Sequence, residues 1–309
     1  MKFRTEVKTN FVGDLIHYKS NILAIGSCFA DNIGGRLKEH EFSVVTNPFG
    51  IIFNPMSILN VLKNSLNQNI EEDLLIARDG HWFHFNYHSD ITATSKQELI
   101  SKISLNQSQT KKQLLESDVL MITFGTAWIY KYLKTQEIVA NCHKIPQAQF
   151  KKELLDLDQL KDDYSIFFTD LFRQNKNRKI ILTVSPVRHI KDGIHENNLS
   201  KSVLFLLSDY LEKKFDNVIY FPAYELIVDD LRDYRFYKED LIHPTDQAIE
   251  YVYEKFSESY FSEKTKKAVE LKSEIIKLEK HRFLNATDEE KKIHFEKIEI
   301  MKQEFDGLK

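Results

Sequence analysis

The chain has 309 residues, of which 42% are hydrophobic and 29% charged, and its formal net charge is −3. These values are typical of a folded globular protein with an apolar core, and the lack of a basic block argues against a nucleic-acid partner. No uncharged apolar run has the length of a signal peptide or a membrane span, so we expect a cytoplasmic protein with no membrane partner. The two cysteines, Cys28 and Cys142, lack zinc or CxxC spacing and are expected to be reduced thiols.

Short apolar runs alternate along the chain with longer segments of helical periodicity. This is the pattern of βαβ units in a parallel sheet. Strands are predicted at residues 22–25, 43–46, 119–124, 179–184 and 217–221, and helices at 31–40, 55–66, 96–115, 148–173, 198–214 and 245–256. Right-handed crossovers between five such strands give an α/β fold, a three-layer α/β/α sandwich in which ligands bind beyond the carboxyl ends of the strands.

Two segments interrupt this alternation and are interpreted as insertions, around residues 78–95 and 128–146. The first contains an aromatic, His-rich stretch at residues 81–91. On an extended strand His84, His88 and Asp90 would share one face and His81 would not, so we expect a structural or ligand-stacking role and no metal. The second insertion is predicted to be a hairpin of two extended runs joined around residues 134–136.

From residue 262 onward the composition shifts to Lys, Glu and scattered Leu and Ile. A charged helix is expected to end near Asn285, and Thr287 with Glu290 has the capping-box spacing that starts another helix. We therefore divide the chain into a main domain, residues 1–261, and a C-terminal helical hairpin, residues 262–309. We expect the hairpin to be a solvated appendage that packs one stripe against the main domain.

The first predicted strand ends at Gly26, and two candidate nucleophiles, Ser27 and Cys28, follow before a helix begins. This order places both side chains at the carboxyl edge of the strand, beside free N–H groups of the helix. Such N–H groups can bind the oxyanion that forms on nucleophilic attack, and they lower the pKa of a thiol. Alternatively, Ser27 caps the helix and Cys28 packs as a small apolar group.

Asp240 and His243 lie three residues apart before the last predicted helix of the main domain, in a loop stiffened by Pro244. At this spacing the carboxylate can accept a hydrogen bond from His243 Nδ1 and hold Nε2 as a base. With a nucleophile at position 27 or 28, the pair would complete a triad in the chain order nucleophile, Asp, His. An isolated D-x-x-H is more often a helix-start Asp beside an incidental His.

These features resemble the SGNH, or GDSL-like, hydrolases, and residues 26–30 reproduce the GSCFA motif that names one branch of them, found chiefly in bacteria. The resemblance covers most of residues 20–260. It also rests on residues 47–50 (NPFG), 123–126 (TFGT), 141–144 (NCHK), 184–187 (VSPV) and 240–244 (DLIHP). It implies a flavodoxin-like, five-stranded parallel sheet and an acyl-ester hydrolase type of site that needs no cofactor.

The resemblance further implies that Gly50 and Gly125 mark the second and third conserved blocks of those hydrolases. In these blocks a backbone N–H and an Asn side chain help to form the oxyanion hole. Two departures are present. Alignment of Gly-Asp-Ser with residues 26–28 puts Cys28, rather than Ser27, at the nucleophile position, and the usual Asn of the third block is replaced by Ala127.

Other groups must supply the missing oxyanion donor if the site is active, and Asn47, Asn141 and the neighbouring Thr126 are the candidates. His143 follows Cys142 directly, and adjacent residues of an extended chain point to opposite faces, so these two are not expected to form a dyad. His143 either faces the pocket, as a substrate contact or second base, or lies on the surface.

Three arginines belong to segments that should approach the carboxyl edge of the sheet: Arg188, Arg232 and Arg235. They either bind an anionic substrate or form surface ion pairs, which is the commoner use of Arg.

The leading hypothesis is an SGNH-like acyl-ester or thioester hydrolase or acyltransferase. In it Cys28 or Ser27 attacks an acyl carbonyl, His243 transfers the proton, and Asp240 orients His243. The substrate is a small-molecule or glycan-linked acyl group, because the aromatic run at residues 82–87 suggests stacking on a ring. The sequence leaves the oligomeric state open.

The alternative is a catalytically weak binding or scaffold protein on the same fold, since a fold does not determine a function. A third reading, a papain-type thiol protease with Cys28 and His143, is disfavoured because those enzymes place the cysteine on a long helix in a different fold.

Overall fold

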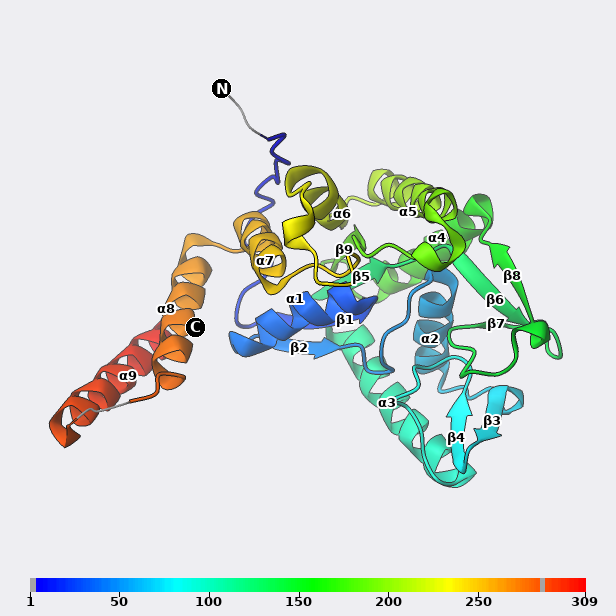
Figure 1. Cartoon of the computed structure of the whole chain (residues 1–309), viewed down its shortest axis with the longest axis horizontal. Helices are drawn as coiled ribbons and strands as arrows, with labels where there is room; N and C mark the ends of the chain where they lie inside the picture. Colours follow the sequence, from blue (N-terminus) through cyan, green and yellow to red (C-terminus); the bar gives the residue numbers. More distant parts are fainter. Residues whose placement is uncertain (1–3, 284–286) are drawn as a thin grey trace.

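The centre of the protein is a five-stranded parallel sheet, seen in a computed structural model that describes residues 4–283 and 287–309. Its strands are β1 (Asn21–Gly26), β2 (Ser43–Thr46), β5 (Val119–Phe124), β9 (Lys179–Val184) and β10 (Val218–Tyr220), in the order β10-β9-β5-β1-β2 (Figure 1). Numbered in chain order, the strands run 2-1-3-4-5 across the sheet, which is the flavodoxin-like arrangement. The five predicted strands and the predicted fold class are confirmed.

The apolar side chains of the strands alternate between two layers of helices. Ile22 and Ala24 of β1 pack in a cluster with α1 (Cys28–Glu39) and α7 (Asp246–Tyr260). Leu23 and Ile25 pack on the other face, in a cluster with α2 (Pro55–Asn67), α3 (Lys96–Glu116), α4 (Leu157–Gln174) and α5 (Ile194–Lys214). Because successive strand residues point to opposite faces, the sheet is buried on both sides and the fold has three layers.

Polar side chains cap most of the main helices. Those of Ser27, Asn54, Ser95, Asp156 and Thr245 each accept a hydrogen bond from a backbone N–H in the first turn of α1, α2, α3, α4 and α7. The helices predicted at residues 55–66, 96–115 and 245–256 are confirmed. The helices predicted to begin at residues 31 and 198 instead begin at Cys28 and Ile194.

The helix predicted at residues 148–173 is wrong in its first part. Residues Phe150–Leu154 form strand β8, which pairs antiparallel with β6 (Trp128–Tyr132), and α4 begins only at Leu157. The segment contains Lys, Glu and Leu, which favour helix, but pairing with β6 outweighs this weak local preference. The hairpin predicted at residues 128–146 is confirmed as β6 and β7 (Ile138–Val139), with β8 as its third strand.

The insertion between β2 and β5 contains a short hairpin of β3 (Leu75–Arg78) and β4 (His81–His84). Asp79 and Gly80 both have positive φ and form its two-residue turn. β4 ends at His84, and the chain then turns, with Tyr87 N–H donating to His84 O at 3.1 Å. The predicted common strand face of His84, His88 and Asp90 is therefore wrong, because this turn separates them.

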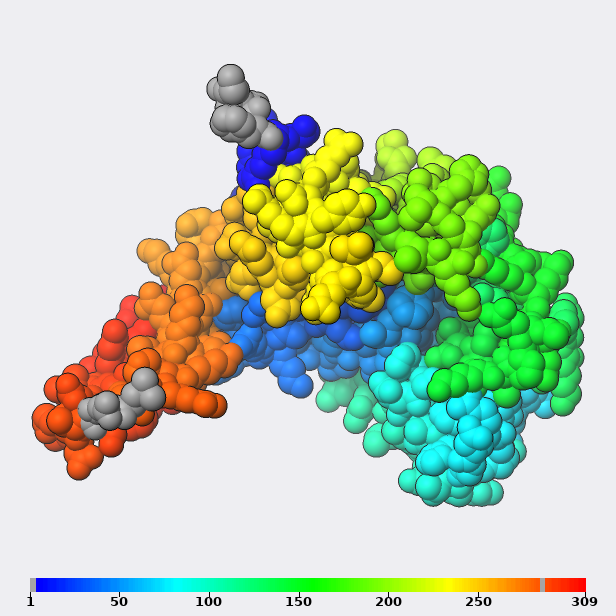
Figure 2. Space-filling model, in the orientation of Figure 1, coloured from blue at the N-terminus to red at the C-terminus, as the bar shows by residue number. Residues whose placement is uncertain are grey.

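Two helices, α8 (Glu263–Glu279) and α9 (Asp288–Leu308), form a hairpin that projects from one end of the molecule (Figure 2). Thr287 and Glu290 form the predicted capping box. α8 ends at Glu279, whereas Asn285, the predicted end, lies outside the described residues. The hairpin is attached to the body through Lys272, whose Nζ lies 2.6 Å from Glu41 Oε1.

The remaining helical elements are short. They are the 3₁₀ segments Glu72–Leu74, Gln147–Gln149, Ile190–Asp192 and Tyr234–Phe236, the three-residue α6 (Ala223–Glu225) and a π-helical turn at Leu226–Asp230. In the part of the chain that the structure describes, no helix combines the length and the apolar character needed to span a membrane.

Candidate functional site

The topological switch point of the sheet lies between β1 and β5. The chain continues from β1 to β2 on one side and from β5 to β9 on the other, so the connections diverge at the carboxyl ends of these two strands. Open α/β sheets bind ligands in the crevice that this divergence creates. Gly26 pairs with Thr123 across the two strands, and Cys28 and Gly125 each follow two residues later. Cys28 therefore lies where the fold favours a ligand site.

The turn after β1 requires glycine. Gly26 has a φ of +136°, and a Cβ atom at this position would lie 2.1 Å from Thr123 O. The Gly26 N–H donates to Asn47 Oδ1 at 2.8 Å, and the Ser27 N–H donates to Thr123 O at 3.1 Å. These contacts fix the direction in which α1 leaves the sheet.

Ser27 and Cys28 have different surroundings. The Ser27 side chain accepts a hydrogen bond from the Phe29 N–H at 3.4 Å as the helix cap, and the residue is 1% exposed. Cys28 is the first residue of α1, is only half-buried, and carries a free thiol. Of the two candidate nucleophiles, Cys28 is the accessible one.

The pKa of the Cys28 thiol is raised, contrary to the sequence-based prediction that the helix N-terminus would lower it. Burial is the main cause, and the nearby Asp31 carboxylate adds to it. The backbone N–H groups of Cys28 and Phe29, and the charge of Lys201, act in the opposite direction. The helix N-terminus does favour the thiolate, but it does not outweigh desolvation.

Asp240 and His243 form a hydrogen-bonded pair in the loop before α7. His243 Nδ1 lies 2.6 Å from Asp240 Oδ2, and Asp240 Oδ1 accepts the backbone N–H groups of Ile242 and His243, both at 2.9 Å. These hydrogen bonds lower the pKa of Asp240 to about 2, with the backbone N–H of His243 as the largest cause. The His243 side chain is 48% exposed, so its Nε2 edge is available to a ligand.

The helices that carry Cys28 and follow His243 lie side by side and in the same direction. Arg36, about two turns into α1, pairs with Glu250, about one turn into α7, at 2.9 Å, and further along both helices the rings of His40 and Tyr253 stack. The first turns of α1 and α7 therefore lie at the same edge of the sheet. Within residues 4–283 and 287–309, no hydrogen bond joins His243 to Ser27 or Cys28.

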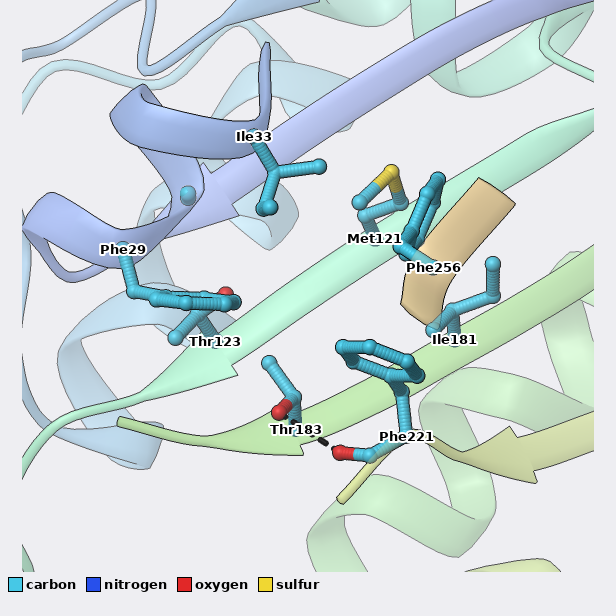
Figure 3. Close-up of a pocket in the computed structure, with 9 residues that line it drawn as sticks. Phe29, Ile33, Met121, Thr123, Ile181, Thr183, Phe221 and Phe256 are labelled. Atoms are coloured by element: carbon cyan, nitrogen blue, oxygen red, sulfur yellow. Dashed lines mark hydrogen bonds between the residues drawn. The ribbon is translucent and has the colours of Figure 1, made fainter. Parts of the chain in front are cut away.

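A closed apolar cavity lies beneath these two helices (Figure 3). Phe29 and Ile33 of α1, Phe256 of α7, and Thr123 and Phe221 are among its lining residues. Its volume of about 10 Å³ is comparable with a single water molecule, so this cavity belongs to the core and not to a substrate site.

The backbone N–H groups of the two glycines that mark the second and third family blocks both make internal hydrogen bonds. The Gly50 N–H donates to Asn47 O at 2.8 Å, and the Gly125 N–H donates to Phe53 O at 2.7 Å. The Gly50 N–H, the backbone donor that the resemblance implies, therefore closes a local turn and is not free in this structure, and the Gly125 N–H makes a contact at the end of β5. Gly50 also has a φ of +74° and packs against His88, where a Cβ atom would lie 2.3 Å from that side chain.

Asn47 and Thr126 also make internal hydrogen bonds. Asn47 Nδ2 donates to Asp31 Oδ1 at 2.7 Å, while its Oδ1 accepts from the Gly26 N–H, so its side chain stabilises the turn that leads to Cys28. Thr126 Oγ1 lies 3.0 Å from Ser200 Oγ and accepts from the Trp128 N–H at 3.1 Å. Both residues adjoin the switch point, and both have structural partners there.

Asn141 and His143 belong to the insertion instead. His143 is buried, with Nε2 2.9 Å from His84 O and Nδ1 3.3 Å from Ser89 Oγ, and Asn141 Nδ2 donates to Ser89 Oγ. The alternative of a surface position for His143 is therefore wrong, and its ring folds against the insertion between β2 and β5. Its alternative role, as a pocket contact or second base, stays a prediction.

Two basic residues at this edge, the buried Lys201 and the half-buried His189, were missed from the sequence. Lys201 of α5 is 2% exposed, and its Nζ donates to Gly125 O at 2.6 Å and to Ser185 O at 2.7 Å. Burial lowers the pKa of Lys201 to about 7. His189 packs edge-on to Phe53, with ring centroids 5.5 Å apart, and its pKa falls to about 4 through burial and the charge of Lys201.

A signal for Lys201 was present in the sequence. Leu204, Leu207 and Leu211 follow it at the spacing of one helix face, so Lys201 lies on the apolar stripe of the predicted helix at residues 198–214. A lysine at such a position is almost never fully buried without a specific partner. His189 has no comparable periodic signal.

A cleft of about 230 Å³ opens beside the Asp240–His243 loop. Arg188 and Arg232 line it, together with Val228, Asp229, Asp233, Tyr234, Tyr237 and Leu241. Arg235 is not among the lining residues, and its Nε lies 3.8 Å from Asp233 Oδ2. In the described part of the chain, neither Arg188 nor Arg232 has a carboxylate oxygen within 4 Å, so both guanidinium groups are available to a ligand.

The fold and the residues at the carboxyl edge of the sheet define a three-layer α/β protein. It has a cysteine as the first residue of α1 and a His–Asp pair in the loop before α7. The sequence profile of the GSCFA family matches residues 21–256, which contain both features, and the chain belongs to this family. No curated protein matches the chain.

Proposed function

We propose that this protein is an SGNH-type hydrolase or acyltransferase that acts on an acyl ester or thioester through Cys28. The observation that carries the proposal is the position of Cys28 at the topological switch point, on the sheet edge that also holds the Asp240–His243 pair. The order nucleophile, Asp, His along the chain is the order of the SGNH hydrolases that the motif resembles. The substrate is of a small-molecule or glycan-linked class.

In the proposed reaction the Cys28 sulfur attacks the acyl carbonyl carbon, and the thiol proton passes to His243 Nε2. The tetrahedral intermediate then breaks its bond to the leaving alcohol or thiol, which takes the proton from His243, and an acyl-Cys28 thioester remains. Water or an acceptor alcohol next attacks this thioester and gives its proton to His243, and the proton returns to the departing Cys28 sulfur. Asp240 stabilises the imidazolium in both steps.

The half-buried position of Cys28 supports it as the nucleophile over Ser27, which is buried as a helix cap. The N–H groups of Cys28 and Phe29 favour the thiolate, and because the Phe29 N–H also donates to Ser27 Oγ, the Cys28 N–H is the oxyanion donor of the proposed mechanism. The geometry of catalytic hydrogen bonds is often loose in the absence of substrate, so the missing contact between His243 and Cys28 is compatible with a role as base.

The cleft beside His243 supports a substrate that carries an anionic group. Arg188 and Arg232 provide planar donors that suit a carboxylate or phosphate, and Tyr234 and Tyr237 provide flat surfaces for a ring. Asp229 and Asp233 also line the cleft, so an anionic group must bind on the arginine side of it.

A panel of short acyl p-nitrophenyl esters and acyl thioesters tests the proposal on the full chain. We expect turnover that is lost in Cys28→Ala and strongly reduced in His243→Ala, and that is retained in Ser27→Ala. Cys142→Ala is the matched control for loss of a thiol. Unchanged turnover in both Cys28→Ala and His243→Ala would overturn the mechanism.

A second candidate is a binding or scaffold protein on the same fold. Its specific support is that the Gly50 N–H is bonded internally and that Ala127 replaces the Asn donor of the third block, which leaves fewer oxyanion donors than the resemblance implies. For this candidate we expect no turnover across the panel and no acyl adduct on Cys28 by mass spectrometry. An adduct confined to Cys28 would exclude it.

A further inference from the structure

We propose that Lys201 is an electrostatic positioning residue whose buried ammonium group stabilises the thiolate form of Cys28. This inference rests on the proposed function, in which Cys28 is the nucleophile, and it assigns a role to a residue outside the family motifs. Lys201 takes no proton from the thiol in this role. It acts in its ammonium form and through its charge alone, while the thiol proton moves to His243.

Lys201 is held rigidly at the switch point. Its Nζ donates to Gly125 O, directly after β5, and to Ser185 O, directly after β9. Because Gly26 pairs with Thr123, Cys28 and Gly125 each lie two residues beyond the last paired position of two neighbouring strands. The lysine therefore ties together the strand ends beside the nucleophile.

The charge of Lys201 has no acidic partner. An ammonium group has three N–H donors, and two of them bind the carbonyl oxygens of Gly125 and Ser185. In residues 4–283 and 287–309, no carboxylate oxygen lies within 4 Å of its Nζ, although the residue is 2% exposed. A buried cation without a counter-ion is costly, and this cost is reduced when a negative charge forms nearby.

The groups around Lys201 leave Cys28 as the source of that negative charge. Arg188 from the loop after β9 disfavours the ammonium form, and Lys201 in turn lowers the pKa of His189 from the same loop. Tyr224 of α6 presents its ring face, with the centroid 6.0 Å from Nζ. Of the ionisable groups that act on Lys201 through their charge, Cys28 of α1 favours the ammonium form and Arg188 disfavours it, and the lysine reciprocally favours the thiolate.

The test is the pH dependence of Cys28 alkylation by iodoacetamide in a Cys142→Ala background, which leaves one cysteine. Lys201→Met removes the charge, Lys201→Gln removes it but keeps a hydrogen-bond donor, and Lys201→Arg keeps both. We expect the thiol pKa to rise in the Met and Gln variants, with alkylation at pH 7 slower by about tenfold for each unit of pKa, and to recover in the Arg variant. A purely structural lysine would leave the thiol pKa unchanged.

A reciprocal measurement needs no substitution of the lysine. In ¹³C-lysine NMR of the wild-type chain and Cys28→Ala, we expect Lys201 to lose its proton at lower pH in the variant. Identical thiol pKa values in wild type, Met and Gln variants, or identical lysine titrations with and without Cys28, would overturn the inference. Both readouts are independent of turnover, so failure of the acyl panel alone would overturn the proposed function and not this role.

Discussion

The two cysteines show how position in the fold determines chemistry. Both are free and half-buried. Cys142 has His143 next to it in the sequence, and Cys28 shares a sheet edge with His243. Cys28 begins a helix at the switch point, with two backbone N–H groups and Lys201 acting to favour its thiolate. Cys142 packs beside the apolar cluster of the insertion, and burial raises its pKa to about 11, with Lys191 giving only slight compensation. A Cys–His neighbourhood alone therefore does not identify a nucleophile.

The largest expected difference between the two cysteines is in turnover. Cys28→Ala should reduce kcat/KM on the best substrate of the acyl panel by about 10³-fold or more, because the covalent route is lost. Cys142→Ala should leave kcat/KM unchanged, because its thiol lies in the insertion. Steady-state kinetics of the two purified variants measure this difference. Equal losses of kcat/KM in both variants would contradict the assignment of Cys28 as the nucleophile.

A smaller loss is expected when the base is removed. His243→Ala should lower kcat by about 10²-fold to 10⁴-fold, because proton transfer to and from the leaving group is lost. The matched control is His143→Gln, which changes a buried histidine of the insertion and should leave kcat within a fewfold of wild type. If instead His143→Gln were the more damaging to kcat in a folded protein, the base would belong to the insertion.

The core of the fold was predictable because its strands are buried on both faces and read as continuous apolar runs between turns, as in Val119–Phe124. β8 was missed because its strand conformation comes from pairing with β6 and not from its own residues. The Asp240–His243 hydrogen bond was predictable from a local spacing of three residues. The other features of the site depend on contacts between residues that are distant in the sequence. The Gly125 N–H hydrogen bond to Phe53 O and the burial that raises the thiol pKa of Cys28 are examples, and neither has a signal in the neighbouring residues.

The insertion between β2 and β5, which is hydrogen-bonded to the Cys142 segment through Phe85 O and the Ala140 N–H, should lose stability in acid. His84 is fully buried, with Nε2 3.0 Å from Glu71 O and Nδ1 accepting the Asn86 N–H at 3.1 Å. One ring nitrogen therefore donates and the other accepts, which only the neutral imidazole can do. Burial lowers the pKa of His84 to about 4. Because the opened insertion binds this proton more readily than the closed one, its stability should fall as pH drops from about 6.5 to about 4, by up to about 3 kcal/mol.

Hydrogen exchange of residues 71–87 at several pH values, corrected for the intrinsic exchange rate, measures this loss. β1 and β5 serve as the internal reference, and His84→Gln should flatten the pH dependence. Exchange protection that is constant between pH 4 and 6.5 would mean that the buried ring does not control the insertion.

The smallest expected effect separates the two thiols by reactivity alone. In single-cysteine variants, Cys28 should react with iodoacetamide about tenfold faster than Cys142 near pH 8, because a pKa of about 11 leaves a smaller thiolate fraction at Cys142. Guanidinium-unfolded protein is the control, since both thiols should then react at one rate. Faster labelling of Cys142 in the folded state would show that exposure, and not the switch-point environment of Cys28, governs thiol chemistry in this protein.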